Sequence, residues 1–278
     1  MTGDQPRPGG PEAARPPAGE PDEISAQADD HPPADPPPGW VTFDCYGTLV
    51  DWRHGIRSGA EAVLPGMGER LLAGYHRHEA AVEAADPPLR YRVVLAETLR
   101  RAAADEGITL DDEASEVLAT TLPLSPVFPD VAAALRALRA EGWHLGVLTN
   151  CDRDLFAITA RRLPVPIDLV VTAEDAGSYK PALGHFARAA EILRGFPGPW
   201  VHVAQSYVHD VEPAERAGVP CVWINRLGED HDRSRAATVR ANLDDLPAAV
   251  AYAASLGADS SRSRDLPASR SRSGWRQM

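Results

Sequence analysis

An alternation of short apolar runs with helical patterns, which begins at residue 40, restricts the fold more than any other feature. The apolar runs have the length of buried strands, and the segments between them carry apolar residues at helical spacing. Strands are predicted at 40–44, 144–150, 167–173, 200–205 and 220–225, and helices at 130–143, 183–195 and 211–218. Strands that alternate with helices predict an α/β fold whose parallel sheet is covered on both faces.

Residues 55–125 carry helical periodicity without a strong strand pattern. This segment interrupts the sheet directly after its first strand, where open parallel sheets bind ligands. We therefore predict a core domain at 39–54 and 126–257, and a helical cap domain at 55–125 that covers an active site. The charged segment 231–240 is predicted to be a mobile loop.

The two ends of the chain differ in composition from this folded part. Residues 1–38 hold 11 of the 26 prolines and eight acidic residues, with almost no large apolar side chains. Such a segment buries too little apolar surface to offset the entropy of ordering, so we predict a disordered acidic tail. It lacks the basic start and apolar run of a secretory signal. Residues 258–278 are rich in serine and arginine and are predicted to be a disordered basic tail.

The net charge of −12 restricts the partners. An acidic surface is a poor general binder of nucleic acid or anionic membranes, so we expect neither as a partner. No apolar run approaches the roughly 20 residues of a membrane span. The isolated cysteines Cys45, Cys151 and Cys221 are typical of reduced thiols. We therefore expect a cytoplasmic protein that acts on a small molecule, either as a monomer or as a homodimer.

Polar residues follow the predicted strands at the edge where these strands end. They are Asp44, the pair Thr149 and Asn150, Lys180, and Asp210. Taken singly, each has an ordinary structural explanation as a cap, a turn residue or a solvated lysine. Because the carboxyl ends of parallel strands lie together, the set is expected to converge on one crevice.

Four segments in this order resemble the motifs of the haloacid dehalogenase superfamily, and most closely its type II 2-haloacid dehalogenases. The segments are "FDCYGTLVDW", "GVLTNCDRDLF", "SYKPALGHFARA" and "VHVAQSYVHDVEPAERAGVPCVWINR". The resemblance covers about residues 40–250. It implies a Rossmann-like parallel-sheet core with a helical cap insertion, and hydrolysis through an aspartate nucleophile in the crevice between them.

Carried over position by position, the resemblance assigns a role to each polar residue of the crevice. Asp44 matches the nucleophile that forms a covalent ester, and Lys180 matches the lysine beside it. Thr149 and Asn150 match a pair that donates hydrogen bonds to the substrate. Asp210 matches the acidic residue of the last motif, which orients Lys180 or the hydrolytic water.

Tyr46 separates this sequence from the phosphatases of the same superfamily. Those enzymes carry a second aspartate at this position, which protonates the leaving group, and they hold Mg²⁺ with a Gly-Asp pair where this chain has Ala204-Gln205. A phenol is a weak general acid, and Mg²⁺ prefers anionic oxygens. A halide leaves as a stable anion and needs neither. We therefore expect a 2-haloacid dehalogenase without a metal or other cofactor, and an Mg²⁺-dependent phosphatase is the alternative.

Two substrate-binding positions are less well defined. Ser206 is the only match to the serine-asparagine pair expected in the last motif of a dehalogenase. The resemblance also implies a cap arginine that grips the substrate carboxylate. Arg77 is taken as that residue, with Arg53, Arg90 and Arg92 as further candidates.

Overall fold

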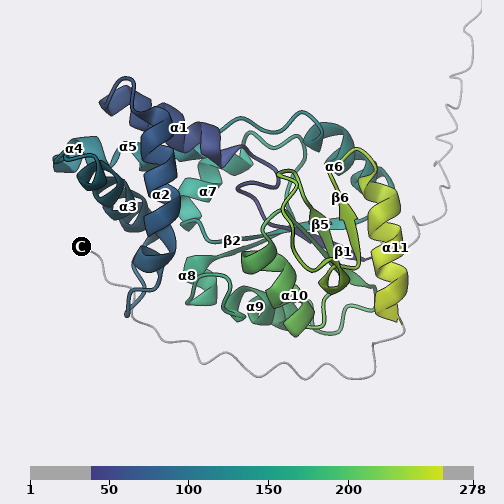
Figure 1. The fold of residues 1–278 in the computed structure, drawn as a ribbon. Helices are drawn as coiled ribbons and strands as arrows, with labels where there is room; N and C mark the ends of the chain where they lie inside the picture. The colour runs from purple at the N-terminus through teal and green to yellow at the C-terminus, as the bar shows by residue number, and fades with distance from the viewer. Residues whose placement is uncertain (1–38, 259–278) are drawn as a thin grey trace, which may run out of the picture. The chain divides into compact units, whose positions relative to one another are not determined.

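The computed structural model describes residues 39–258, so the predicted tails lie outside the described residues except for Ala258. Six parallel strands form one sheet in the order β3-β2-β1-β4-β5-β6 (Figure 1). The strands are β1 (Trp40–Phe43), β2 (His144–Thr149), β3 (Leu169–Thr172), β4 (Trp200–Ala204), β5 (Cys221–Ile224) and β6 (Thr238–Arg240). The predicted α/β fold is confirmed.

Helices cover both faces of the sheet (Figure 1). The helices are α6 (Val131–Ala140), α7 (Arg153–Ala160), α8 (Ala173–Ala176), α9 (Gly184–Ile192), α10 (Glu212–Arg216) and α11 (Leu246–Ala258), with the single turns η2 (Tyr207–Val211) and η3 (Arg233–Arg235). Helices α9 and α10 lie on one face, and α6 and α11 lie on the other. No helix of residues 39–258 is long and apolar enough to cross a membrane.

Strand β1 is the centre of the sheet, because it pairs with both β2 and β4. Its residues Val41, Thr42 and Phe43 are all fully buried. A strand covered on both faces by helices needs apolar residues on both, which explains the continuous apolar run in the sequence. Since all six strands are parallel, Asp44 leaves the sheet at the edge where the neighbouring strands also end.

Two parts of the core differ from the sequence-based expectation. Residues 231–240, predicted to be a loop, contain η3 and the edge strand β6. This strand is only three residues long and pairs only with β5, so it carries no apolar alternation that the sequence could reveal. Helix α7, which had not been predicted, begins at Arg153, directly after the loop that follows β2.

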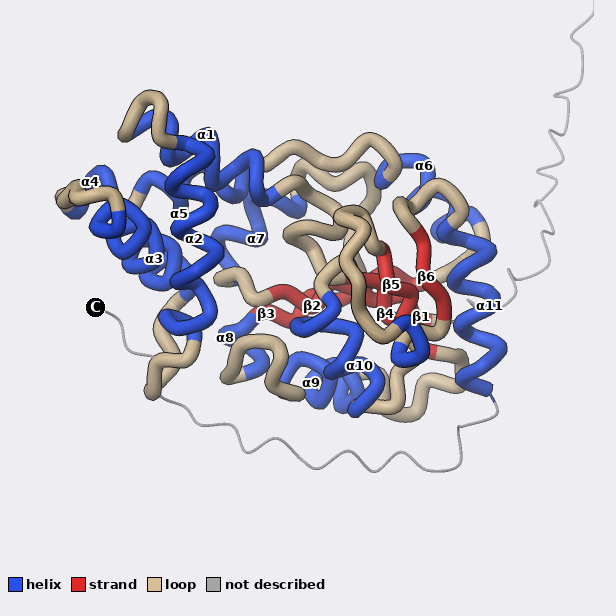
Figure 2. Tube along the Cα trace, in the orientation of Figure 1, coloured by secondary structure: helices blue, strands red, loops and turns tan. Residues whose placement is uncertain are grey.

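A second group of helices joins β1 to α6 (Figure 2). We call them the cap helices: α1 (Trp52–Val63), α2 (Gly68–Glu83), α3 (Tyr91–Asp105), α4 (Asp112–Ser115), α5 (Val117–Thr121) and η1 (Leu122–Leu124). They begin at Trp52, slightly before the predicted boundary. Helices α2 and α3 approach closely at Gly74, where an added Cβ would lie 2.8 Å from the Cβ of Ala102. A larger residue at position 74 would therefore push the two helices apart.

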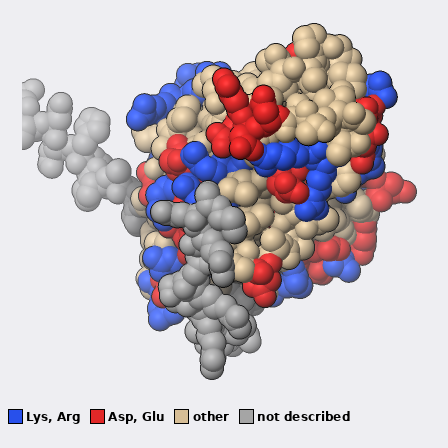
Figure 3. Space-filling model, turned by 90° about the vertical axis from the view of Figure 1, so that its left-hand side faces the viewer, with Lys and Arg blue, Asp and Glu red and all other residues tan. Residues whose placement is uncertain are grey.

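Asp152, in the loop after β2, fastens the cap helices to the core. Its fully buried carboxylate accepts hydrogen bonds from the backbone N–H groups of Tyr91 (2.9 Å) and Arg92 (3.1 Å). These are the first free donors of α3, so a residue of the core caps a helix of the cap. Arg90 and Arg92 also pair with the exposed Asp154. In Figure 3 a band of basic side chains crosses the surface and lies against acidic clusters.

We expect Asp152→Ala to lower the free energy of unfolding by about 2–4 kcal/mol, because two buried N–H groups lose a charged acceptor. Urea denaturation measures this loss. Asp154→Ala is the matched control, since it removes a neighbouring carboxylate whose side chain is 54% exposed. The control should cost under about 1 kcal/mol. If both variants lose the same free energy of unfolding, Asp152 does not stabilise the protein by capping α3.

Candidate active site

A cavity of about 290 Å³ lies where the cap helices meet the carboxyl edge of the sheet. Asp44, Thr149, Asn150, Lys180 and Asp210 all line it, so the structure brings the predicted polar constellation into one place. Residues from α1, α2, α3 and the loop after β5 complete its walls. The cavity therefore combines groups from the core with groups from the cap.

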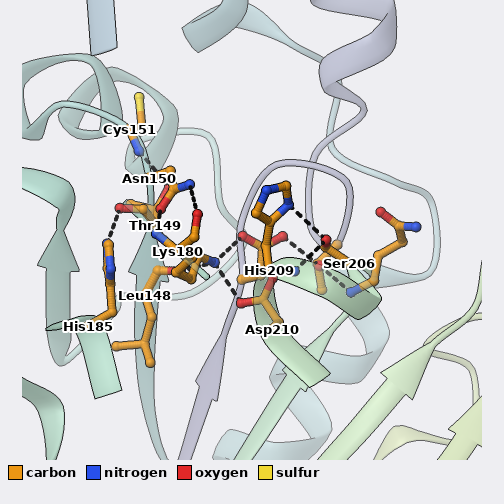
Figure 4. A network of polar contacts seen from close by, with 12 residues as sticks. Leu148, Thr149, Asn150, Cys151, Lys180, His185, Ser206, His209 and Asp210 are labelled. Carbon is orange, nitrogen blue, oxygen red and sulfur yellow. Dashed lines mark hydrogen bonds and ion pairs between the residues drawn. The ribbon is translucent and has the colours of Figure 1, made fainter. Parts of the chain in front are cut away.

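The Lys180 ammonium group lies between two carboxylates at the bottom of this cavity (Figure 4). Its Nζ donates to Asp44 Oδ1 at 2.9 Å, to Asp210 Oδ1 at 2.7 Å and to the carbonyl oxygen of Leu148 at 2.9 Å. The side chains of Lys180, Asp44 and Asp210 are at least nine-tenths buried. All three hydrogens of the ammonium group are therefore used, and its direction is fixed.

The electrostatics of this triad separate the two aspartates. Burial alone would lower the pKa of Lys180, but the charges of Asp210 and Asp44 outweigh it and raise that pKa. Burial raises the pKa of Asp44 despite the nearby lysine. Burial also acts against the charged form of Asp210, yet Lys180 and His202 lower its pKa to about 2. Asp44 is thus the more basic carboxylate and the better nucleophile of the two.

Thr48 fixes the second oxygen of Asp44. Its hydroxyl donates to Asp44 Oδ2 at 2.9 Å, and it accepts a hydrogen bond from the backbone N–H of Gln205 at 2.9 Å. The sharp turn that brings Thr48 back to the nucleophile uses Gly47, whose φ of 104° suits glycine. Sequence reasoning had missed this hydroxyl.

A buried polar chain inside the sheet supports Asp210. The indole of Trp200 donates to Thr42 Oγ1 (2.8 Å), which also lies within hydrogen-bond distance of His202 Nδ1 (2.9 Å). His202 Nε2 donates to Asp210 Oδ1 (3.1 Å). Thr42 and His202 face each other across β1 and β4. Sequence reasoning missed this chain, although polar residues inside two predicted strands were the available signal.

The side chains of the predicted pair Thr149 and Asn150 form hydrogen bonds mainly with backbone groups. Asn150 Oδ1 accepts from the Lys180 backbone N–H at 2.7 Å, and its Nδ2 donates to the Lys180 carbonyl at 3.2 Å. Thr149 Oγ1 accepts from the N–H of Cys151, and the Thr149 carbonyl accepts from His185 Nε2 at 3.0 Å. Asn150 therefore holds the loop that carries the lysine.

Tyr46 also lines the cavity, but its hydroxyl is already engaged. It lies 2.7 Å from Thr159 Oγ1, and the Thr159 hydroxyl donates to the carbonyl of Pro123. Tyr46 is therefore the donor, so its hydrogen is directed away from any leaving group. Burial further raises the pKa of Tyr46 well above its ordinary value. Tyr46, which stands where phosphatases have a second aspartate, therefore cannot protonate a leaving group here.

Ser206 lies on the other side of Lys180 from Asn150, next to His209 (Figure 4). Its hydroxyl oxygen accepts from the backbone N–H of His209 at 3.2 Å and lies 3.0 Å from His209 Nδ1. Burial lowers the pKa of His209, so this ring is mainly neutral at pH 7. Ser206 thus orients a neutral imidazole that lines the cavity.

The candidate arginines separate clearly in the structure. Arg77 does not line the cavity; its side chain is 55% exposed and pairs with Asp105 at 2.7 Å. Arg90 and Arg92 are occupied by the ion pairs that join α3 to the core. Arg53 alone of the four lines the cavity, with its guanidinium 5.8 Å from the Trp52 ring centre. The structure therefore does not bring Arg77 to the site, because that position lies on the outer side of α2.

Two glutamates of α2 form a wall of the cavity that sequence reasoning missed. Glu79 accepts from the hydroxyls of Tyr75 and Tyr91, both at 3.1 Å, and Glu83 lies 3.4 Å from Asn150 Nδ2. Burial raises the pKa of Glu79, and burial together with Glu79 raises the pKa of Glu83 well above its ordinary value. Their four-residue spacing, which puts both on one helix face, was the available signal.

The donor set does not match an Mg²⁺ site. Within residues 39–258, no group of three or more His, Cys, Asp or Glu side chains is arranged to hold a metal ion. Gln205 provides an amide where a carboxylate would be required, and its Nε2 is 3.5 Å from Glu229 Oε2. The Lys180 ammonium also occupies the space between Asp44 and Asp210. We therefore derive no catalytic step through a metal.

Comparison with known proteins agrees with this geometry. The family model described as "haloacid dehalogenase-like hydrolase" matches residues 39–218. The chain belongs to this family. It is a hydrolase whose predicted nucleophile and lysine meet in the buried triad.

Among similar proteins, an (S)-2-haloacid dehalogenase of Pseudomonas putida is 28% identical over 194 residues, 67% of this chain and 84% of that protein. A phosphoglycolate phosphatase of Shigella boydii is 26% identical over 230 residues, 74% of this chain and 90% of that protein. The crystal structure of an L-2-haloacid dehalogenase has a TM-score of 0.66 and 26% identity, covering 74% of this chain and 96% of that one. The L-2-haloacid dehalogenase of Xanthobacter autotrophicus, at 19% identity and a TM-score of 0.67, shares the fold and covers 77% of this chain and 98% of its own.

His185 should make the folded protein sensitive to acid. Burial lowers its pKa to about 3, and its Nδ1 has no hydrogen-bond partner. Since the unfolded chain binds a proton near pH 6.5 and the folded one does not, stability falls as the pH drops from about 6.5 towards 3. We expect His185→Gln to reduce the slope of unfolding free energy against pH by up to about 1.4 kcal/mol per pH unit.

Urea denaturation at several values between pH 4 and 7 measures this slope. His54→Gln serves as the control, because His54 is exposed on α1 and its replacement should leave the slope unchanged. An identical slope in wild type and His185→Gln would contradict the prediction.

Proposed function

We propose that the protein hydrolyses the carbon–halogen bond of a short 2-haloacid, which yields a 2-hydroxy acid. The observation that carries this proposal is the placement of Lys180 between Asp44 and Asp210 in a cavity without a free acid at Tyr46. The named 2-haloacid dehalogenases among its relatives support the same reaction. The phosphatase relative keeps phosphate-ester hydrolysis as the alternative to be tested.

In the first step, a carboxylate oxygen of Asp44 attacks C2 of the substrate and displaces the halide. The bond to carbon forms as the bond to halogen breaks, so an ester joins Asp44 to the substrate and C2 is inverted. Lys180 and Thr48 hold the two oxygens of Asp44 in a fixed direction before attack. The halide leaves with the bonding electrons and requires no proton, which is consistent with the engaged hydroxyl of Tyr46.

In the second step, water attacks the ester carbonyl of Asp44. Lys180 Nζ then stabilises the negative oxygen that develops, since it already lies 2.9 Å from Asp44 Oδ1. We assign the proton of this water to His209, which lines the cavity as a neutral ring. When the intermediate collapses, the bond between the ester carbonyl carbon and the substrate oxygen breaks, and His209 returns the proton to that oxygen. The 2-hydroxy acid leaves, and Asp44 loses the remaining proton to solvent and is a carboxylate again. Asp210 acts as a positioning residue that keeps Lys180 charged and directed at the nucleophile. Thr149, whose Oγ1 is bonded only as an acceptor, has a hydroxyl hydrogen for a substrate atom.

Within this proposal, Arg53 takes the role of the carboxylate anchor that the sequence had assigned to Arg77. Its guanidinium lines the cavity and forms no ion pair with any described carboxylate. A location in the cytoplasm also belongs to the proposal, and the free, buried thiols of Cys45, Cys151 and Cys221 support it.

The reaction predicts that 2-chloropropionate releases chloride in the presence of EDTA, and that Asp44→Asn loses this activity by at least about 1000-fold. Mass spectrometry of rapidly quenched protein should find the ester mass on the peptide that contains Asp44. Mg²⁺-stimulated turnover of p-nitrophenyl phosphate, without halide release from any 2-haloacid, would instead establish the phosphatase.

The anchor predicts that Arg53→Gln raises the KM for 2-chloropropionate by roughly 10–100-fold, because a charged hydrogen bond to the substrate is worth about 1.5–3 kcal/mol. The change in kcat should be smaller. Steady-state chloride release measures both. Arg77→Gln is the matched control and should stay within about twofold of wild type, since Arg77 pairs with Asp105 outside the cavity. If Arg77→Gln raises the KM and Arg53→Gln does not, Arg77 is the residue that binds the substrate carboxylate.

A further inference from the structure

The charges around the cavity do not balance. Lys180 is shared by Asp44 and Asp210, so this triad carries a net negative charge when its acids are ionised. Glu79 and Glu83 add two further carboxyl groups from α2, whereas Arg53 is the only other Lys or Arg that lines the cavity. A simple 2-haloalkanoate brings another negative charge and would leave this acidic wall without a partner.

Neither Glu79 nor Glu83 forms an ion pair with a described residue, although the charge of Lys180 acts on Glu83 and partly offsets the rise in its pKa. No Lys, Arg or His of residues 39–258 lies within ion-pair distance of either carboxyl group. Both are half-buried and face the cavity. Desolvation raises the pKa of both groups. Carboxylates in this position are expensive to keep ionised, and a bound cation would offset that cost.

Asp210 has one carboxylate oxygen without a hydrogen-bond partner. Its Oδ1 is bonded to Lys180 and His202, but its fully buried Oδ2 has no hydrogen-bond partner among the described residues. Asp210 lines the same cavity as Glu79 and Glu83. This oxygen has essentially no exposed surface, so a ligand in the cavity would contact Glu79 and Glu83 rather than Asp210 Oδ2.

The described carboxyl groups suit an organic cation better than a metal ion. A metal ion would require three or more donors in a suitable arrangement, and the described residues contain no such group. An ammonium group needs only hydrogen-bond acceptors and negative charge, which the carboxyl oxygens of Glu79 and Glu83 supply. The aromatic rings of Tyr75 and Tyr91 hold Glu79 in place through their hydroxyls.

The positive and negative ends of the cavity are separated along α2. Arg53 lies over Trp52, whose ring contacts His76 with a centroid distance of 4.9 Å. Glu79 and Glu83 follow His76 by one and two turns of the same helix, so the wall from His76 to Glu83 rises about 10 Å. An anion at Arg53 and a cation at Glu83 would therefore lie at opposite ends of one elongated site.

We infer that the substrate is a zwitterionic 2-haloacid with an ammonium group at the far end of its chain, whose carboxylate binds Arg53 and whose ammonium binds Glu79 and Glu83. This inference deepens the proposed function and rests on it for the reaction. The core supplies the displacement at C2, and the cap selects the substrate through charges at both ends.

Turnover tests the inference with two substrates of equal length. We expect 6-amino-2-chlorohexanoate to be dechlorinated with a kcat/KM at least about tenfold above that of 2-chloroheptanoate, in which a methyl group replaces the ammonium. The double variant Glu79→Gln/Glu83→Gln should remove this preference, so that its kcat/KM values for the two substrates, measured with the same variant, become equal within about twofold. Glutamine keeps a carbonyl oxygen for the tyrosine hydroxyls, and thermal unfolding checks that the double variant is folded.

Glu69→Gln is the matched control, because Glu69 lies on the same helix but is 72% exposed and pairs with Arg57. It should keep the wild-type preference. Equal kcat/KM values for the two substrates in wild type, or an unchanged preference in the double variant, would overturn the inference.

Binding separates this inference from the proposed reaction. Calorimetry with the full chain should show tighter binding of 6-aminohexanoate than of heptanoate by at least about tenfold, and the double variant should lose the difference. If this holds while no 2-haloacid releases halide, the proposed reaction fails and the zwitterion site stands. If halide is released but 6-aminohexanoate binds no better than heptanoate, the reaction stands and the zwitterion site is wrong.

Discussion

A single buried ammonium group, that of Lys180, holds the active site together. Two carboxylates and a lysine in a protein interior are costly, and the arrangement is tolerable only when every charge is paired and directed. Lys180 meets this condition by donating to Asp44, to Asp210 and to the carbonyl of Leu148. Removal of Lys180 would leave two largely buried carboxylates without an opposite charge. The surrounding structure can be understood as the means of keeping this group in position.

Residues of the sheet and of its loops keep Lys180 in position from two sides. Asn150 clamps the backbone of Lys180 with two hydrogen bonds, so the lysine is fixed before its side chain leaves the loop. On the opposite side, His202 holds Asp210 from within β4, and Thr42 of β1 forms a hydrogen bond with the other ring nitrogen of His202. The polar residues inside these two central strands are thus connected to the chemistry. Their burial is affordable because each hydrogen bond passes to the next group in the chain.

The core site could be predicted from the sequence because it depends on topology. Once parallel strands are predicted, the residues that follow them must meet at one edge, and Asp44 and Asp210 do so. The cap could not be predicted in this way. Helical periodicity shows which face of a helix is buried, but not whether that face meets a core or a cavity. Arg77 was therefore placed at the site and lies outside it, whereas Glu79 and Glu83 had the appearance of a solvated acidic face.

The core and the cap also differ in how their charged groups are paired, and this difference affects which substrates the site can bind. In the core triad each charge finds an opposite charge within the protein, so Lys180 and its aspartates need no ligand to be stable. In the cap, Arg53, Glu79 and Glu83 form no ion pair with any residue that the structure describes, although all three line one cavity. Unpaired charged groups of this kind are common at functional sites, where a ligand supplies the opposite charge. The same nucleophile could therefore serve many substrates, and the charges of the cap restrict which of them reach it.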